Sequence, residues 1–202
     1  VGLGGAELPP PPYDQVLARR EWVRVYDALQ SGDPEGARQQ ARAYQQTVQQ
    51  TAGLHYLIGR ASLELSDIPA AQEAFRAAVA LDPGHTPSWL QLGDIALASG
   101  DLDLATTAFT AVSEGQTMGR DAWLGPLRLC EVAAMRGEVG TFEEQLREAI
   151  QRGFDLASVV NDPQWHAFYA DERLTDSLRK MLVVYADERT RDRFDRGIQG
   201  PL

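Results

Sequence analysis

The chain has 202 residues, of which 44% are hydrophobic, enough to bury a substantial core. It carries 29 acidic and 19 basic residues, so neither nucleic-acid binding through phosphate neutralisation nor attraction to an anionic membrane surface is expected. The single cysteine, Cys130, excludes an intramolecular disulfide framework, and no apolar run approaches the roughly 20 residues that span a bilayer.

Residues 1–12, VGLGGAELPPPP, contain four consecutive prolines and three glycines. Such a composition cannot pack a core and favours extended structure, so these residues are predicted to form a flexible arm. The glycine cluster over residues 2–5 has no strand before it and no helix start after it. A phosphate-binding loop is therefore not predicted.

After Tyr13 the sequence is punctuated by turn residues at regular distances. Gly32, Ser66 and Gly100 are 34 residues apart, and an aspartate follows each of them. Between these turns the apolar residues follow helical spacing twice in each period. In one period the two apolar faces are Trp89, Leu92, Gly93 and Ala96, and then Ala105, Phe109 and Val112. No stretch alternates apolar and polar residues as a half-buried strand does, so an all-α fold of repeated helix pairs is predicted.

This pattern resembles the tetratricopeptide repeat (TPR) family, whose helix-turn-helix units carry the pattern W-x2-L-G-x2-Y, A-x3-F and P. The resemblance is strongest over residues 52–119. The matching residues are Ile58, Gly59, Ala71, Phe75, Ala78 and Pro83 in one unit, and Trp89, Leu92, Gly93, Ala105 and Phe109 in the next. The resemblance implies a right-handed solenoid of about three to four repeats with C-terminal capping helices.

The pattern divides the chain into five parts. They are the arm over residues 1–12, a divergent first helical repeat over 13–51, two well-formed repeats over 52–119, a divergent repeat over 120–153, and capping helices with a charged tail over 154–202. In the divergent repeat over 120–153, Trp123 follows Trp89 by 34 residues, but the second helix around Phe142 runs about three residues late. The first helix or the turn of this repeat is therefore expected to be longer.

The first repeat needs a shift in register. Strict spacing places Glu21 and Arg24 in the core, whereas a shift by one residue places an apolar set there instead. That set, which is the predicted core face, is Trp22, Val25, Tyr26 and Leu29.

Beyond Gly153 the period is lost, and two further helices are predicted between Asn161 and Leu182. The first is expected to be capped by Asp162 with Pro163 in its opening turn, and the second to open near Thr175. Their apolar residues are expected to cover the last repeat: Trp165, Phe168, Tyr169, Leu174, Leu178, Met181 and Leu182. In the charged tail, ion pairs are predicted between Asp187 and Arg191 and between Asp192 and Arg196.

Catalytic chemistry is not indicated by the sequence. The three histidines, His55, His85 and His166, belong to different elements and have no second ligand at metal-site spacing. Glu143 and Glu144, near a helix start, are interpreted as surface charges that favour the helix dipole. The sequence therefore predicts a protein without metal, cofactor or enzymatic activity, and the alternative of an all-helical enzyme requires carboxylates that converge from distant positions.

The family resemblance implies a concave wall, lined by the first helix of each repeat, that binds peptide segments of other proteins. The residues predicted to face this wall are Tyr56, Arg60, Leu63, Leu90, Asp94, Leu97, Leu124 and Arg128, with Glu131 beside them. Tyr56, Arg60 and Leu90 are expected to dominate binding, whereas Leu63 and Leu97 are equally compatible with the core. The chain is thus predicted to be a non-catalytic protein-interaction module, a scaffold or adaptor.

The partner is expected to be a peptide or helix, with cationic character favoured because residues 51–119 contain eight acids and two bases. Self-association through the terminal repeats, including a homodimer, is the alternative. A cytoplasmic location is expected. The alternative is a periplasmic location, or one tethered to a membrane through the N-terminal arm.

Overall fold

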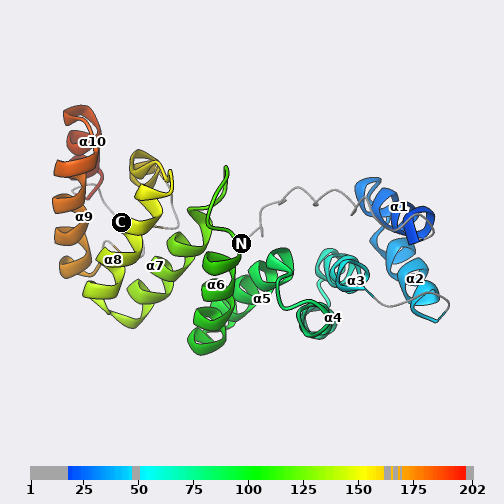
Figure 1. The fold of residues 1–202 in the computed structure, drawn as a ribbon. Helices are drawn as coiled ribbons and strands as arrows, with labels where there is room; N and C mark the ends of the chain where they lie inside the picture. The colour runs from blue at the N-terminus through cyan, green and yellow to red at the C-terminus, as the bar shows by residue number, and fades with distance from the viewer. Residues whose placement is uncertain (1–17, 47–50, 162–164, 166–167, 169, 199–202) are drawn as a thin grey trace. The chain divides into compact units, whose positions relative to one another are not determined.

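The computed structural model describes residues 18–46, 51–161, 165, 168 and 170–198. Every regular element in these residues is a helix, which confirms the predicted all-α class (Figure 1). The helices fall into two compact units with a boundary between Ile95 and Ala96, and each unit is described by itself. Among the described residues, no helix combines the length and apolar character that a membrane crossing requires.

The first unit is built from helix pairs that pack in chain order. Its helices are α1 (Ala18–Gln30), α2 (Pro34–Gln45), α3 (Ala52–Glu64), α4 (Ile68–Leu81) and the part of α5 (Thr86–Ser99) that ends at Ile95. Helix α2 packs against both α1 and α3, and α3 packs against α4. Val25, Leu57 and Phe75 are fully buried in this unit. The burial of Val25 beside an exposed Arg24 agrees with the shifted core face predicted for the first repeat.

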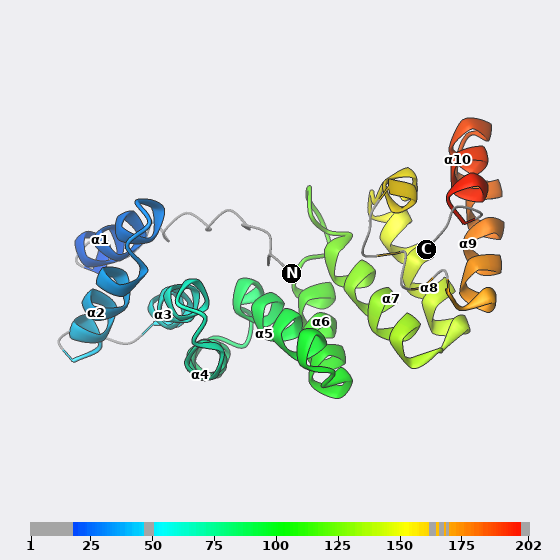
Figure 2. The same ribbon diagram turned by 180° about the vertical axis from the view of Figure 1, so that it is seen from behind.

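The second unit is also built from packed helix pairs and ends in a cap. Its helices are α6 (Leu102–Gly115), α7 (Leu124–Arg136), α8 (Val139–Gln151), the 3₁₀ helix η1 (Leu156–Asn161), α9 (Glu172–Tyr185) and α10 (Glu188–Ile198). Helix α7 packs against α6 and α8, and the three lie side by side in both views (Figures 1 and 2). Helix α9 packs against α8 and α10.

One turn geometry closes the successive helix pairs. In each pair a backbone N–H at the start of the second helix donates to a carbonyl near the end of the first, over 2.8–2.9 Å. The donor–acceptor pairs are Asp33–Ala28, Asp67–Ser62, Asp101–Ala96 and Glu138–Ala133. The residue before each donor has a positive φ, and these residues are Gly32, Ser66, Gly100 and Gly137. The 34-residue period of the sequence is therefore the spacing of the first three of these left-handed turns, at Gly32, Ser66 and Gly100.

The divergent repeat departs from the period at a different place from the one predicted. Helix α7 has 13 residues, as α3 has, and its turn at Gly137 matches the other turns. The additional residues lie in the connection from α6 to α7, residues 116–123, which is longer than the α4–α5 connection over residues 82–85. The prediction of a longer first helix or turn is therefore corrected. Trp123 is not inside the first helix but directly precedes α7, makes no side-chain hydrogen bond to the start of that helix, and places its ring 5.3 Å from that of Phe154.

The C-terminal helices cover the last repeat as predicted. Six of the expected residues form or join one core cluster with Phe142 and Leu146: Trp165, Leu174, Leu178, Met181 and Leu182 are buried, and Phe168 is partly buried. Tyr169, Asp162 and Pro163 lie outside the described residues, so the predicted cap of the preceding helix does too.

Helix α9 begins three residues earlier than the predicted start at Thr175. Asp171 caps it by accepting a hydrogen bond from the backbone N–H of Arg173, over 3.0 Å. In the tail, the predicted charge pairs are replaced by contacts to the backbone. The carboxylate of Asp187 accepts from the N–H of Thr190, and Arg196 donates to the carbonyl of Asp192.

Candidate protein-interaction surface

The shared turn defines which residues of the first helices are equivalent. Counted back from the turn residues Asp33, Asp67, Asp101 and Glu138, the same position is occupied by Tyr26, Arg60, Asp94 and Glu131. These four residues, together with the residues one helical turn before or after them on the same helix, are called the turn-matched row. Those neighbours are Leu29, Tyr56, Leu63, Leu90, Leu97, Leu127 and Ala134.

The turn-matched row corrects the register predicted for α7. Leu124 and Arg128 were expected to be equivalent to Leu90 and Asp94, but they stand three residues too early because residues 116–123 extend the connection before α7. Leu127 and Glu131 occupy the equivalent positions and are 8% and 7% exposed. Leu124 and Arg128 are half-buried beside them.

On α3, Tyr56 and Arg60 are enclosed by their own repeat. The ring of Tyr56 is 2% exposed and lies 5.8 Å from the ring of Phe75 and 5.6 Å from that of His85. Its hydroxyl accepts a hydrogen bond from Nη1 of Arg60 over 3.4 Å. Because these two side chains are mostly used inside the repeat, they hold the surface of α3 in place rather than presenting a large contact area.

The exposed part of this surface lies beside them. Nη2 of Arg60 is 3.7 Å from Oε1 of Glu64, whose side chain is 58% exposed, and Leu63 is half-buried. Leu90 and Asp94 on α5 are half-buried too and belong to the same unit. The first unit thus offers partly exposed leucines together with carboxylates.

In the second unit, Arg128 and Glu131 form an ion pair within α7. Nη1 of Arg128 lies 2.7 Å from Oε2 of Glu131, a carboxylate that is almost fully buried. A buried carboxylate requires such a partner because removal from water strongly disfavours an isolated charge. Leu97 is half-buried in this unit.

The titratable groups outside the row have environments set by burial. Burial lowers the pKa of His55 and also that of His85, where the nearby Asp82 carboxylate opposes the effect. Burial and the adjacent Glu131 raise the pKa of the Cys130 thiol well above its ordinary value. His166 lies outside the described residues. In the part of the chain that the structure describes, no group of three or more His, Cys, Asp or Glu side chains could hold a metal ion.

Two arginines join neighbouring elements without any signal in the sequence pattern. Arg38 of α2 pairs with Asp67 at the next turn over 3.1 Å and with Glu35 over 2.9 Å. Arg152, after α8, donates through Nη1 to the carbonyl of Ser113 over 2.9 Å and pairs with Glu148 over 2.7 Å. Both residues lie outside the apolar spacing from which the helices were predicted, so periodicity could not identify them.

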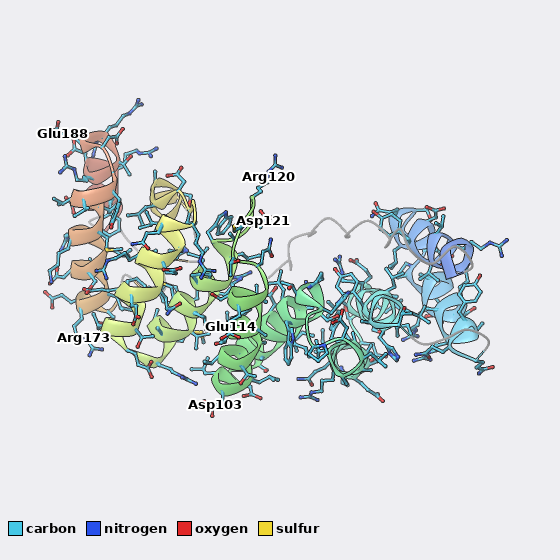
Figure 3. All side chains as sticks on the ribbon, in the orientation of Figure 1. Asp103, Glu114, Arg120, Asp121, Arg173 and Glu188 are labelled. Carbon is cyan, nitrogen blue, oxygen red and sulfur yellow. The ribbon has the colours of Figure 1, made fainter. Side chains whose placement is uncertain are left out.

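The same Nη1 of Arg152 also lies 3.5 Å from the carbonyl of Ala122, so this arginine joins both ends of the α6–α7 connection. Arg120 and Asp121 lie on this connection where it projects from the helices (Figure 3). Met118 on the same connection is 81% exposed. The insertion is therefore fixed at its base and exposes a large apolar side chain.

Comparison with protein families agrees with this geometry. The family model described as "Tetratricopeptide repeat" matches the chain twice, over residues 23–86 and 56–119. Each match contains one whole helix pair, α3 with α4 in the first and α5 with α6 in the second, and the shared turns at Asp67 and Asp101 lie within the matched region. A comparison with curated protein sequences gave no significant match.

Several solved structures have the same architecture. A MamA fragment, 41-end, from Desulfovibrio magneticus RS-1 has a TM-score of 0.63 at 17% identity, covering 92% of this chain and 95% of that one. A MamA RS-1 double mutant has a TM-score of 0.64 at 17% identity, covering 92% and 94%. TTC0263, a thermophilic TPR protein in Thermus thermophilus, has a TM-score of 0.55 at 16% identity, covering 90% and 99%. At these identities the likeness shows the helical repeat fold alone.

Proposed function

Because this chain belongs to the tetratricopeptide repeat family, we propose that it is a non-catalytic interaction module whose first helices bind a peptide or helical segment of a partner protein. The observation that carries the proposal is the pair Leu90 and Asp94 on α5. Both are half-exposed and stand at turn-matched positions, where the equivalent residues of α3 and α7 are buried. A leucine beside a carboxylate at the surface of a first helix suits a ligand that carries both apolar and charged groups.

The charge of the region favours a cationic partner segment. Residues 51–119 contain eight acids and two bases, and in the first unit Arg60 is already paired with Glu64. An approaching basic peptide would gain from the carboxylates of Glu64 and Asp94, while its apolar side chains contact Leu63 and Leu90. In this proposal Tyr56 and Arg60 are positioning residues, because their buried side chains pack within the repeat and hold α3 in place.

Peptide selection tests the proposal even though the partner is unidentified. A phage-displayed library of short random peptides is selected on the immobilised full chain, and an enriched peptide is synthesised with a fluorescent label. We expect enriched peptides to combine leucine-like residues with lysine or arginine. Enrichment of acidic peptides would contradict the proposed charge preference.

Matched variants then place the binding site. The double variant Leu90→Ser/Asp94→Arg alters the proposed surface, whereas Glu73→Arg adds positive charge on the exposed face of α4, a second helix. Fluorescence anisotropy should give at least about a tenfold loss of affinity for the double variant, which corresponds to about 1.4 kcal/mol. Glu73→Arg should bind as the natural chain does. Equal affinities for all three proteins would show that the first helices are not the binding surface.

A second candidate, self-association, is favoured by one apolar patch. At the end of α9, Val183, Val184 and Tyr185 are 63%, 70% and 42% exposed. Exposed apolar residues that adjoin one another are typical of contact surfaces between proteins. Sedimentation velocity at several concentrations tests this candidate, with Val183→Asp/Val184→Asp as the variant that should remain monomeric. A natural chain that stays monomeric at every concentration rules the candidate out.

A further inference from the structure

His85 is the last residue of the connection between α4 and α5, and its backbone carbonyl accepts hydrogen bonds from the first turn of α5. Its N–H donates to the carbonyl of Asp82 over 3.0 Å, and its carbonyl accepts from the N–H groups of Ser88 and Trp89 over 3.0 and 3.3 Å. Its Nδ1 atom is 2.9 Å from Oγ of Ser88, a side chain with no exposed surface. The imidazole is thus fixed at the N-terminal end of α5 by a contact with the first turn of that helix.

The other side of the imidazole contacts α3. The ring centre of His85 lies 5.6 Å from that of Tyr56, with an interplanar angle of 58°. Tyr56 in turn packs on Phe75 of α4 and accepts a hydrogen bond from Arg60. A single titratable side chain therefore connects the start of α5 with the buried face of α3, and all of these residues lie in the first unit.

The groups around this ring act in both directions on a positive charge, and the Asp82 carboxylate favours it. From α5, the N-terminal N–H groups present the positive end of the helix dipole. From α3, Arg60 brings a guanidinium to Tyr56, with Glu64 on its far Nη2 atom. On the connection, the Asp82 carboxylate attracts a proton, and the face of the Tyr56 ring favours a cation.

Burial decides between these effects. Burial lowers the pKa of His85, and this effect is larger than the attraction of the Asp82 carboxylate, because Asp82 is exposed to solvent. Because the imidazole is disfavoured as a cation in the packed arrangement, a proton is accepted more easily when the ring leaves Tyr56.

We propose that His85 is a pH-sensitive latch: at mildly acidic pH, protonation of its ring releases the start of α5 from α3. This inference is independent of the proposed function, because it concerns packing within the first unit alone. A change of this kind alters the geometry of α5, the helix that runs from the first unit into the second.

Amide hydrogen exchange measures the latch directly. The N–H groups of Ser88 and Trp89 report on it because both donate to the His85 carbonyl, whereas the N–H of Glu138 reports on an equivalent helix pair in the second unit. Exchange is measured by NMR at about pH 7.5 and about pH 5, corrected for the intrinsic rate. We expect the protection of the Ser88 and Trp89 N–H groups to fall about tenfold for each unit by which packing lowers the pKa of His85. The protection of the Glu138 N–H should fall less.

Two variants separate His85 from the other histidines. His85→Gln keeps a hydrogen-bonding group for Ser88 but does not titrate in this range, so its protection should not fall in acid. His55→Gln removes another buried histidine of α3 and should retain the acid-induced loss. An unchanged acid response in His85→Gln, or no response in the natural chain, overturns the proposal.

A direct titration keeps the proposal testable if His85→Gln fails to fold. The ring proton signals of His85 in the natural chain give its pKa by NMR. A value below 6.5, together with the loss of protection at Ser88 and Trp89, supports the latch. A value at or above 6.5 contradicts it, because the packed state would then bind the proton as readily as the open one.

Discussion

Gly59 of α3 lies in direct contact with the ring of Phe75 in α4, and no space remains there for a side chain. A Cβ atom built on Gly59 would lie 2.7 Å from both Cδ1 and Cζ of Phe75, which is itself fully buried. The distance between α3 and α4 is therefore set by the absence of a side chain at this position.

Gly59→Ala should destabilise the first unit, because either the Phe75 ring or one helix must move to admit the methyl group. The expected loss is about 1–3 kcal/mol in the free energy of unfolding, measured by denaturant titration. Gly140→Ala is the matched control in α8, where no atom lies within 4 Å of the new Cβ. That variant should be unchanged or more stable by up to about 1 kcal/mol, from helix propensity. A Gly59→Ala protein as stable as the control would contradict the close contact.

Ser66 is the single described non-glycine residue with a positive φ, at 59°. The equivalent turns use Gly32, Gly100 and Gly137, and a side chain in this left-handed conformation costs about 1–2 kcal/mol. Ser66→Gly should therefore raise the free energy of unfolding by about 1 kcal/mol, less the entropy that glycine adds to the unfolded chain. Gly100→Ser makes the reverse change at φ 79° and should destabilise. Changes of the same sign in both variants would show that the turn conformation does not govern their stability.

The period of the sequence was sufficient to predict the fold because it reports a local backbone requirement. Gly32, Ser66 and Gly100 mark a left-handed turn, and the aspartate after each one caps the next helix, so both signals recur in every repeat. The core residues Phe75 and Phe109 follow from the same spacing. Such information lies within a few residues along the chain.

The positions of the candidate surface residues were less predictable because they depend on contacts between residues that are distant in the sequence. A strict 34-residue period assigned Arg128 to the position that Glu131 occupies, since nothing local shows that residues 116–123 are a longer connection. In the same way, helical spacing puts Tyr56 on the predicted surface, but the rings of Phe75 and His85 enclose it. Those contacts appear only when α3 packs against the residues that follow it.

Glu138 occupies a capping position that its side chain does not use. Asp33, Asp67 and Asp101 each accept a hydrogen bond from a backbone N–H of the following helix, at 2.9, 3.3 and 3.1 Å, whereas Glu138 makes no such bond. Glu138→Asp shortens the side chain to the length that fits this cap. It should stabilise the second unit by about 0.5–1 kcal/mol, measured by thermal or denaturant unfolding.

The matched control is Asp101→Glu, which lengthens a working cap and should lose a similar amount. A stabilising effect of Asp101→Glu would show that side-chain length does not decide capping at these turns.

Arg152 should be required for the position of the α6–α7 connection. Arg152→Met keeps most of the aliphatic side chain but removes the donors to the Ser113 and Ala122 carbonyls. Loss of these bonds should destabilise the second unit by about 1–3 kcal/mol and speed amide exchange in residues 116–123. Arg120→Met is the control, because Arg120 lies exposed on the projecting connection (Figure 3). Equal exchange in both variants would mean that Arg152 does not hold the connection.

Cys130 should act as a chemical reporter of unfolding in the second unit. Its side chain is fully buried, and burial raises the pKa of the thiol well above its ordinary value, with the adjacent Glu131 adding to the effect. Because the thiolate is the nucleophile, the packed protein should not react with a thiol reagent even at mildly alkaline pH, but should react fully in denaturant. Leu146→Ala removes part of the core cluster that contains Cys130 and should cost about 2–5 kcal/mol, so it should accelerate labelling under native conditions. Rapid labelling of the natural chain, at the rate of a free thiol, would contradict the burial of Cys130.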